Sequence, residues 1–259
     1  GRIWTLDYEL RRVEELGDGA PLRDNSLVVM DGEGNVQERV SLLDLLQSSP
    51  DLYTMQPGTT RMFEGGAELD LFHANVVETM HQPQLVGSHP LYVEDAVLVC
   101  IRNQDTLALF DWSEKKLLWA WGQGILSGPH DATLLPGGNI LAFDNGLGRD
   151  WSRVIEVDPR TNEIVWEWRD TEDPTAFYSK TRGANQRLSN GNTLIVESES
   201  GRVFEVDGKG EIVWQLINPN VTDKREPSVI VRIRRFEGMG YEQLAAAVES
   251  GEGLPLFVD

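Results

Sequence analysis

The sequence lacks several features that would place it in a large class of proteins. Its 259 residues include one cysteine, Cys100, so an intrachain disulfide is excluded. No apolar run approaches the roughly 20 residues that a membrane-spanning helix needs. No charged segment followed by an apolar one opens the chain, as a signal peptide would. Basic residues are also scarce: 23 Lys and Arg stand against 42 Asp and Glu. The resulting net charge of −19 argues against a nucleic-acid partner.

The rest of the composition is typical of a soluble globular protein, with 40% hydrophobic and 25% charged residues. We interpret the acidic composition as one that keeps the protein soluble. The alternative is that the acidic residues form a face that docks a basic protein partner. Residues 1–7 begin in the middle of a strand pattern, which predicts that an N-terminal segment is missing. An export signal or membrane anchor would lie there, so any membrane association would come only through that segment.

Three strand patterns recur in the same order, at offsets of 53, 49 and 48 residues. The matched pairs are 136–144 with 189–197, 152–158 with 201–207, and 162–168 with 210–216. Each unit alternates apolar with polar residues and carries Gly-containing turns, so it predicts a small antiparallel sheet. Such a sheet cannot bury both faces alone, but it can when stacked radially on its neighbours. The repeat therefore predicts an all-β, antiparallel β-propeller.

About four blades are countable, and the rest of a larger ring would precede them. They cover residues 1–45 (a partial blade), 73–121, 130–168 and 183–216. Trp119, Trp166 and Trp214 end corresponding strands and are predicted to pack between blades, and Cys100 is predicted to be buried. Residues 45–70 predict a long loop, and residues 228–259 predict a closing strand (228–234) and a short helix (238–250). The whole chain, 1–259, is expected to form one domain.

Two of the four histidines occupy similar places. His73 and His130 each open a blade just before its first strand, and the innermost strands of a propeller line its central channel. Histidine there could act as nucleophile, general acid/base or metal ligand. The alternative is that each caps its strand. His81 and His89 lie in a loop and are expected at the surface.

Four arginines fall at blade edges: Arg102, Arg149, Arg153 and Arg182. A guanidinium in a central funnel can clamp sulfate, phosphate or carboxylate, although exposed arginines are also common. The sequence has no HExxH, CxxC or His-x-His pattern, so no metal or other cofactor is predicted.

Residues 128–146, 152–156 and 186–195 carry a resemblance to the arylsulfotransferase family. The most specific part is His-Asp-x-x-x-Leu-Pro-x-Gly-Asn followed by Phe-Asp-Asn-Gly. The resemblance implies a six-bladed propeller, periplasmic or extracellular and possibly membrane-anchored. It also implies transfer of a sulfuryl group between phenolic compounds through a sulfated histidine, so a phenol or aryl sulfate is the expected partner.

The resemblance also implies site residues. Two of the family's histidine positions map onto His73 and His130, and its arginine maps onto Arg149 or, alternatively, Arg153. These four residues are the predicted catalytic set. The predicted substrate-binding residues are Asn75, Asp131, Asn145 and Arg102.

The sequence departs from the family in one respect. The family's nucleophilic histidine belongs to a later blade, which here begins Gly183-Ala184-Asn185-Gln186. Either His73 or His130 has taken over, or the activity is lost. The first hypothesis is therefore an arylsulfotransferase-like enzyme. The second is a non-catalytic extracytoplasmic propeller that serves as a binding or assembly subunit of a larger complex. A third hypothesis is a quinoprotein dehydrogenase, but the sequence lacks the pair of cysteines expected of that class.

Overall fold

The computed structural model of the chain describes residues 2–13, 19–224, 226–236 and 245–246. The described part folds into four β-sheets. The first sheet contains β1 (Ile3–Arg11), β2 (Leu22–Met30), β3 (Val36–Ser41), β4 (Thr59–Phe63) and β5 (Gly66–Asp70). In this sheet β2 pairs with both β1 and β3, and it meets β5 through one parallel pair.

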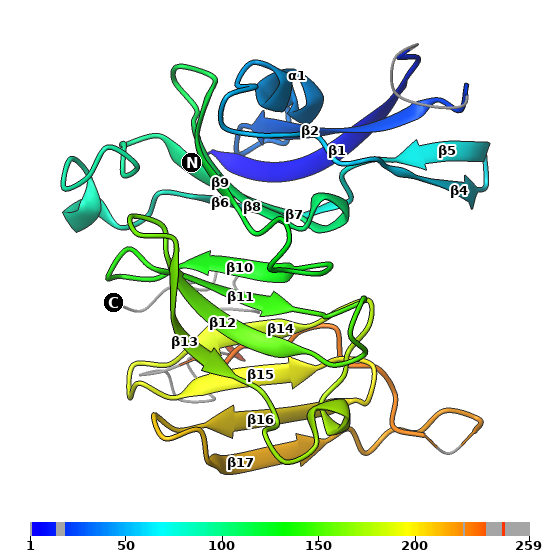
Figure 1. Cartoon of the computed structure of the whole chain (residues 1–259), viewed down its shortest axis with the longest axis vertical. Coiled ribbons are helices and arrows are strands. Elements are labelled where there is room, and N and C mark those ends of the chain that lie inside the picture. Colours follow the sequence, from blue (N-terminus) through cyan, green and yellow to red (C-terminus); the bar gives the residue numbers. More distant parts are fainter. Residues whose placement is uncertain (1, 14–18, 225, 237–244, 247–259) are drawn as a thin grey trace.

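The other three sheets each consist of four antiparallel strands in sequence order (Figure 1). The second sheet contains β6 (Ala74–Thr79), β7 (Ala96–Ile101), β8 (Thr106–Asp111) and β9 (Lys116–Trp121). The third contains β10 (His130–Leu134), β11 (Ile140–Asp144), β12 (Arg153–Asp158) and β13 (Glu163–Trp168). The fourth contains β14 (Ala184–Arg187), β15 (Thr193–Glu197), β16 (Arg202–Val206) and β17 (Ile212–Ile217). These are the blades that the repeat predicted. A register shift recurs at the same place in each sheet, near the end of β2, β8, β12 and β16, which confirms the repeat.

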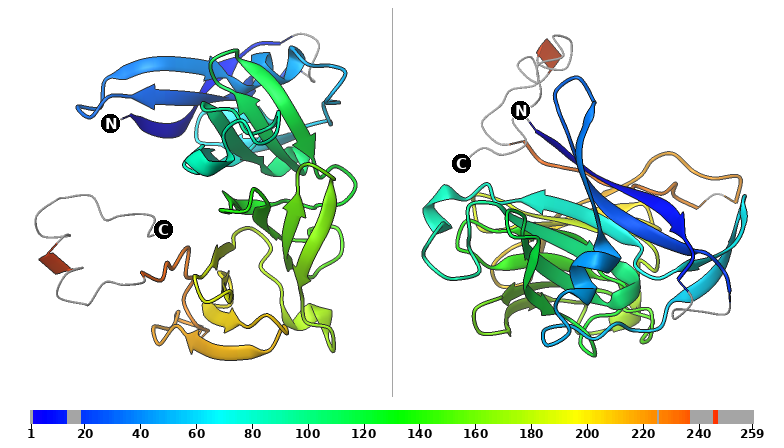
Figure 2. Two further views of the ribbon diagram at one scale, coloured as in Figure 1. Left: turned by 90° about the vertical axis from the view of Figure 1, so that its left-hand side faces the viewer. Right: turned by 90° about the horizontal axis from the view of Figure 1, so that it is seen from above.

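The sheets follow one another along an arc, with the first strand of each four-stranded sheet on the inner side (Figure 2). β10 lies against β6 and β14, and β1 lies against β6. The fold is therefore all-β and of the antiparallel propeller type, as predicted. None of the described helices is long and apolar enough to cross a membrane.

Burial along the strands follows from this stacking. Every residue of β7, β11 and β15 is buried. Neighbouring sheets cover both faces of β7 and β11, whereas β15 has a sheet on one face and the segment with Ile230 and Ile233 on the other. Buried Cys100 on β7 fits its prediction. Trp119 is 7% exposed and donates its indole N–H to Asn162 of the next sheet (2.7 Å), so it packs between blades as expected. Trp166 is partly buried and packs against the cluster that joins the last two blades, as expected. The prediction for Trp214 is wrong for the described residues, because it lies on β17, whose residues are all exposed, and is 46% exposed.

Two predicted segments differ from the structure. The loop predicted over residues 45–70 contains the end of helix α1 (Leu42–Gln47) and the β4–β5 hairpin. The helix forms because Ser41 caps it and its four leucines are buried. The hairpin turns at Glu64-Gly65, between the paired residues Phe63 and Gly66. The closing strand predicted over 228–234 is absent, because side chains rather than a backbone ladder hold this segment. The helix predicted over 238–250 lies outside the described residues, apart from 245–246.

An aromatic cluster joins the last two blades. The Phe177 ring packs edge-on against Phe143 (5.6 Å between centroids), Trp168 (5.0 Å) and Phe204 (5.6 Å). Phe177 is 1% exposed and comes from the loop after β13, so it fills the space between two sheets.

We predict that Phe177→Ala lowers the free energy of unfolding by about 3–5 kcal/mol, because it leaves a cavity that the surrounding rings cannot close. Urea unfolding followed by fluorescence measures the change. Val213→Ala, at an exposed position of β17, is the control and should shift stability by about 0.5 kcal/mol or less. A Phe177→Ala loss no larger than the control's would contradict the packing described.

Candidate functional site

His130 is the first residue of β10, and its ring is held by the loop that follows β11. Its Nδ1 lies 2.8 Å from Asn145 Oδ1 and 3.1 Å from the carbonyl oxygen of Gly128. The Asn145 amide nitrogen donates to the carbonyl oxygens of Ser179 and Arg182 (2.6 and 2.7 Å), so its oxygen must face the histidine. Both neighbours of Nδ1 are then acceptors, and Nδ1 must carry the hydrogen. In the neutral ring the lone pair is therefore on Nε2.

The surroundings also keep this imidazole neutral. Burial lowers the pKa of His130 below its usual 6.5, and the hydrogen bonds to Asn145 and Gly128 oppose that shift. The positive charges of Arg102 and His73 lower the pKa further, so both are close enough to act on the ring. At neutral pH His130 is thus an uncharged base with a lone pair on Nε2.

His130 opens onto a pocket of about 190 Å³ on the inner side of the blades. Asn75, which also lines it, donates its side-chain amide to the carbonyl oxygen of Pro129 (2.9 Å). The other lining residues come from the inner strands, the turn before β14 and the segment after β17: Asp131, Arg182, Gly183, Val231 and Arg232. The predicted site residues that meet here are His130, Asn75 and Asp131.

His73 lies outside the lining of this pocket. Its Nδ1 is 2.7 Å from the Asp70 carboxylate, and its side chain is 42% exposed. Burial acts to raise the pKa of Asp70, but the hydrogen bond and charge of His73 hold it below its usual value. The sequence predicts the same position for His73 and His130, just before the first strand of a blade. In the structure their positions differ. His130 is the first residue of β10, whereas Ala74 is the first of β6, because each strand has its own irregular pairing at the start.

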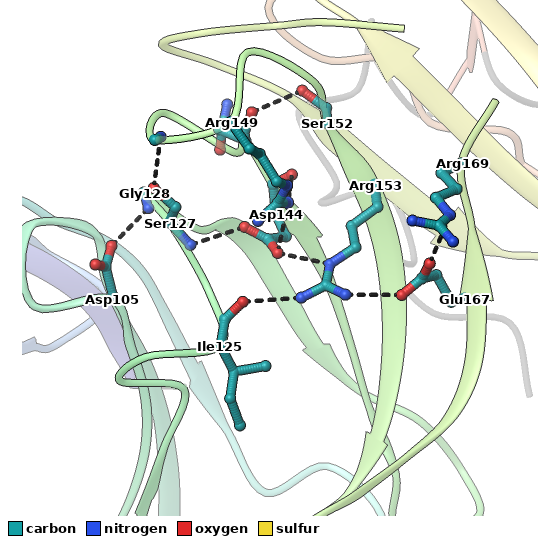
Figure 3. Close-up of polar contacts among 12 residues, drawn as sticks. Asp105, Ile125, Ser127, Gly128, Asp144, Arg149, Ser152, Arg153, Glu167 and Arg169 are labelled. Atoms are coloured by element: carbon teal, nitrogen blue, oxygen red, sulfur yellow. Dashed lines mark hydrogen bonds and ion pairs between the residues drawn. The ribbon is translucent and has the colours of Figure 1, made fainter. Parts of the chain in front are cut away.

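Arg149 and Arg153 both lie on the buried carboxylate of Asp144, each 2.8 Å from its Oδ2 (Figure 3). Arg153 also reaches Glu167 (2.7 Å) and the carbonyl oxygen of Ile125 (2.8 Å). Arg169 also pairs with Glu167 (3.2 Å), so three guanidiniums share two carboxylates. Neither Arg149 nor Arg153 lines the pocket, so their place in the structure is to hold the loops around it.

The loop that carries Gly128 is tied down by two carboxylates (Figure 3). Asp144 accepts a hydrogen bond from the backbone N–H of Ser127 (2.9 Å), and Asp105 accepts one from Gly128 (2.6 Å). The carbonyl oxygen that contacts His130 is therefore fixed in position.

Arg102 is a buried cation of a different kind. It is 7% exposed, donates to Asn103 Oδ1 (2.8 Å), and makes no ion pair with any carboxylate in the described part of the chain. Burial lowers its pKa, and the charge of Arg61 adds to that shift. Its Nε lies 3.9 Å from where a Cβ of Gly128 would stand, so a buried positive charge lies close to the His130 loop, and the charges of Asp70 and Asp105 partly offset the shift of its pKa.

Asp131 follows His130 and is 3% exposed. Its Oδ2 accepts a hydrogen bond from the backbone N–H of Asn185 (2.7 Å), and its Oδ1 pairs with Arg232 (2.5 Å) and Arg234 (3.1 Å). The carboxylate is therefore engaged by protein groups on both oxygens. Sequence reasoning did not select Arg232. The feature that could have identified Arg232 is the basic run Arg232-Ile233-Arg234-Arg235 in a strongly acidic chain.

Glu78 on β6 lies close to this cluster. Its carboxylate accepts a hydrogen bond from the backbone N–H of Leu134 (2.8 Å). Burial raises the pKa of Glu78 to about 7, and the negative charge of Asp131 adds to the shift, while Arg234 and Thr133 oppose it. The pocket region is therefore less negative at neutral pH than its carboxylates suggest.

Comparison with known proteins gives one family and several distant structures. The sequence profile of the family described as "Arylsulfotransferase (ASST)" matches residues 1–219. No curated protein sequence matches the chain. The chain is similar to the structure titled "Structure of Dos1 propeller", with 15% identity and a TM-score of 0.47. The match covers 84% of this chain and 49% of that one, so the chain spans about half its length. It is also similar to virginiamycin B lyase from Staphylococcus aureus, with 9% identity, a TM-score of 0.41, and 88% and 69% of the two chains covered.

We predict that two-dimensional ¹H–¹⁵N NMR finds the hydrogen of neutral His130 on Nδ1 and a pKa below 6.5. In Asn145→Ala the pKa should fall further, because the variant removes a hydrogen bond that favours the charged ring. His89 in the same spectra is the internal reference, since its ring lies outside this site. An Nε2–H tautomer at His130 would contradict the hydrogen-bond assignment.

A second prediction concerns Glu78. Its folded pKa of about 7 exceeds the usual 4.5, so the stability that the neutral acid contributes is complete below pH 4.5 and lost as the pH rises through 7. The loss amounts to about 3 kcal/mol at most. Glu78→Gln should flatten the pH dependence of unfolding across this range, whereas Glu163→Gln, exposed on β13, should leave it unchanged. Parallel profiles for the wild type and Glu78→Gln would refute the assignment.

Proposed function

The chain belongs to the arylsulfotransferase family, and on this premise we propose that it transfers a sulfuryl group between phenolic compounds with His130 as the nucleophile. The observation that carries the proposal is the state of the His130 ring. It is neutral, its Nδ1–H is held by Asn145 and Gly128 so that its lone pair is on Nε2, and His130 lines a pocket. Nucleophilic catalysis by histidine requires that combination.

In the proposed reaction Nε2 of His130 attacks the sulfur of an aryl sulfate. The S–O bond to the aryl group breaks, the phenolate leaves, and a sulfuryl group remains on the ring. The oxygen of a second phenol then attacks the sulfur, the N–S bond breaks, and His130 returns to its neutral form. The proton of the second phenol is finally taken up by the first phenolate, so the exchange is balanced without a cofactor.

We assign the proton transfer to His73. Its ring is held by Asp70 at 2.7 Å, half-exposed, and its charge acts on His130. A carboxylate behind a histidine stabilises the imidazolium and fixes its orientation, which suits a general acid/base. The departure of a phenolate and the approach of a phenol both need such a group.

Negative charge develops on the sulfuryl oxygens in the transition state, and a nearby cation would stabilise it. In this proposal the guanidinium of Arg102 is that cation. It is buried, has no carboxylate partner in the described residues, and already acts on the His130 ring. A fixed charge in a water-poor site acts strongly on a transition state. Arg149 and Arg153 then serve as positioning residues, because Asp144 holds both and also fixes the loop before His130.

The later blade begins with Ala184, which cannot carry a sulfuryl group, so in this proposal His130 is the sole nucleophile. The family resemblance also supports export to the periplasm or cell exterior as part of the proposal. The second candidate is the non-catalytic binding or assembly subunit. It differs from the first in one measurable respect, turnover of an aryl sulfate.

We predict that the full chain transfers the sulfuryl group of a chromogenic aryl sulfate to a phenol acceptor, with a burst of the first phenol. His130→Ala should lower the rate roughly 10³-fold or more, since it removes the nucleophile. His81→Ala, in the loop after β6, is the control and should retain the rate. Mass spectrometry of the quenched enzyme should find one added sulfuryl group in the wild type.

Full activity in His130→Ala would overturn the assignment of the nucleophile. The absence of both burst and transfer in the wild type would remove the enzymatic proposal and leave the non-catalytic subunit.

A further inference from the structure

The segment after the last blade forms one wall of the His130 pocket. Residues 228–236, here called the strap, have no regular secondary structure and run beside β14 (Figure 2, orange). The backbone N–H of Ile230 donates to the carbonyl oxygen of Ser198 (3.1 Å). Arg235 and the Gln186 side chain exchange two hydrogen bonds, of 2.8 and 2.9 Å. The strap is thus docked on Gln186 of β14 and on Ser198, directly after β15.

Apolar packing holds the strap independently of its charges. Ile230 and Ile233 pack against the buried cluster of the last blade. That cluster consists of Ala184, Leu188, Leu194, Val196 and Val203. Loss of a single arginine should therefore leave the strap in place.

The charges of the strap are not balanced at the pocket. Arg232 and Arg234 share one oxygen of Asp131, whereas Arg235 pairs with Glu205 away from the pocket. One carboxylate thus serves two guanidiniums, which leaves about one positive charge over. Arg182, which also lines the pocket, is exposed and has no ion pair in the described part of the chain. On a protein of net charge −19, this is a local cationic spot beside His130.

Arg232 has the free donors to use that charge. Its contact with Asp131 occupies one Nη2 hydrogen, and no other hydrogen bond of its guanidinium is present among the described residues. Its side chain is 52% exposed and lines the pocket with His130. The remaining N–H groups form the planar fork that matches the oxygens of a sulfate or carboxylate.

We propose that Arg232 of the strap is the substrate-binding residue that selects anionic ligands in the His130 pocket, by hydrogen bonding to the sulfo group of an aryl sulfate. This inference rests on the proposed function. The strap then has a role in specificity: it brings to the pocket a guanidinium from a segment about 100 residues away from His130 in the chain. Val231 and Gly183 also line the pocket, and the aryl group would lie against them.

The test is calorimetric titration of the full chain with 4-nitrophenyl sulfate, with the neutral phenol acceptor, and with inorganic sulfate. Arg232→Gln should weaken binding of the aryl sulfate about 10- to 100-fold, the usual loss for a hydrogen bond to a charged group. It should leave phenol binding unchanged. Inorganic sulfate binding with the same dependence on Arg232 would show that the oxyanion, not the ring, is what this residue recognises.

Arg235→Gln is the matched control, because it removes a guanidinium from the same strap at a position that does not line the pocket. It should leave aryl sulfate binding unchanged. Equal weakening by both variants would attribute the effect to docking of the strap and overturn the role of Arg232. Unchanged affinity in Arg232→Gln, or no aryl sulfate binding by the wild type, would overturn it as well.

Different results would contradict the role of Arg232 and the proposed sulfuryl transfer through His130. Binding that depends on Arg232 without any transfer would leave the inference standing and remove the proposed function. Transfer that depends on His130 with an unchanged KM in Arg232→Gln would do the reverse.

Discussion

The packing of each sheet on the next is the constraint from which the rest of the structure follows. The central strands β7, β11 and β15 are mostly apolar, and they are buried because a neighbouring sheet covers each face, except that residues after β17 cover the second face of β15. The same stacking sets the inner strands side by side, with β10 between β6 and β14. The turns that precede these strands therefore meet at one end of the blades. A pocket arises there without any strand being specialised for it.

Within that frame, the chemistry depends on how neighbouring loops hold one imidazole. Asn145 accepts the Nδ1–H of His130 while its own amide is fixed by two carbonyl oxygens of the next connection. Asp144 ties down the preceding loop through Ser127 and takes up the charges of Arg149 and Arg153. The most conspicuous arginines of the motif thus stabilise the loops, and the cations near His130 come from elsewhere in the chain.

The local electrostatics run against the charge of the whole protein. The chain carries a net charge of −19, yet the pocket is lined by Arg182 and Arg232 together with the buried carboxylate of Asp131, which pairs with Arg232. Arg102 adds a further buried positive charge that forms no ion pair with a carboxylate of the described residues. Long-range repulsion of anions and short-range attraction at one spot together favour small anions that can enter the pocket over extended polyanions.

The sequence by itself determined the repeat, the all-β propeller-type fold and the candidacy of His130. Strand periodicity, Gly turns and a motif are local in the chain, so they can be read along it. Only the tertiary structure decided which arginines are free, because whether Arg149 or Arg232 is neutralised depends on carboxylates 5 and 101 residues away, respectively. Residues 59–70 and the strap also differ from the prediction. The former form a hairpin where a loop was expected, and the strap is held by ion pairs and two isoleucines where a strand was expected. In the strap, contacts distant in sequence outweighed the local pattern, whereas the pairs of the hairpin are themselves local.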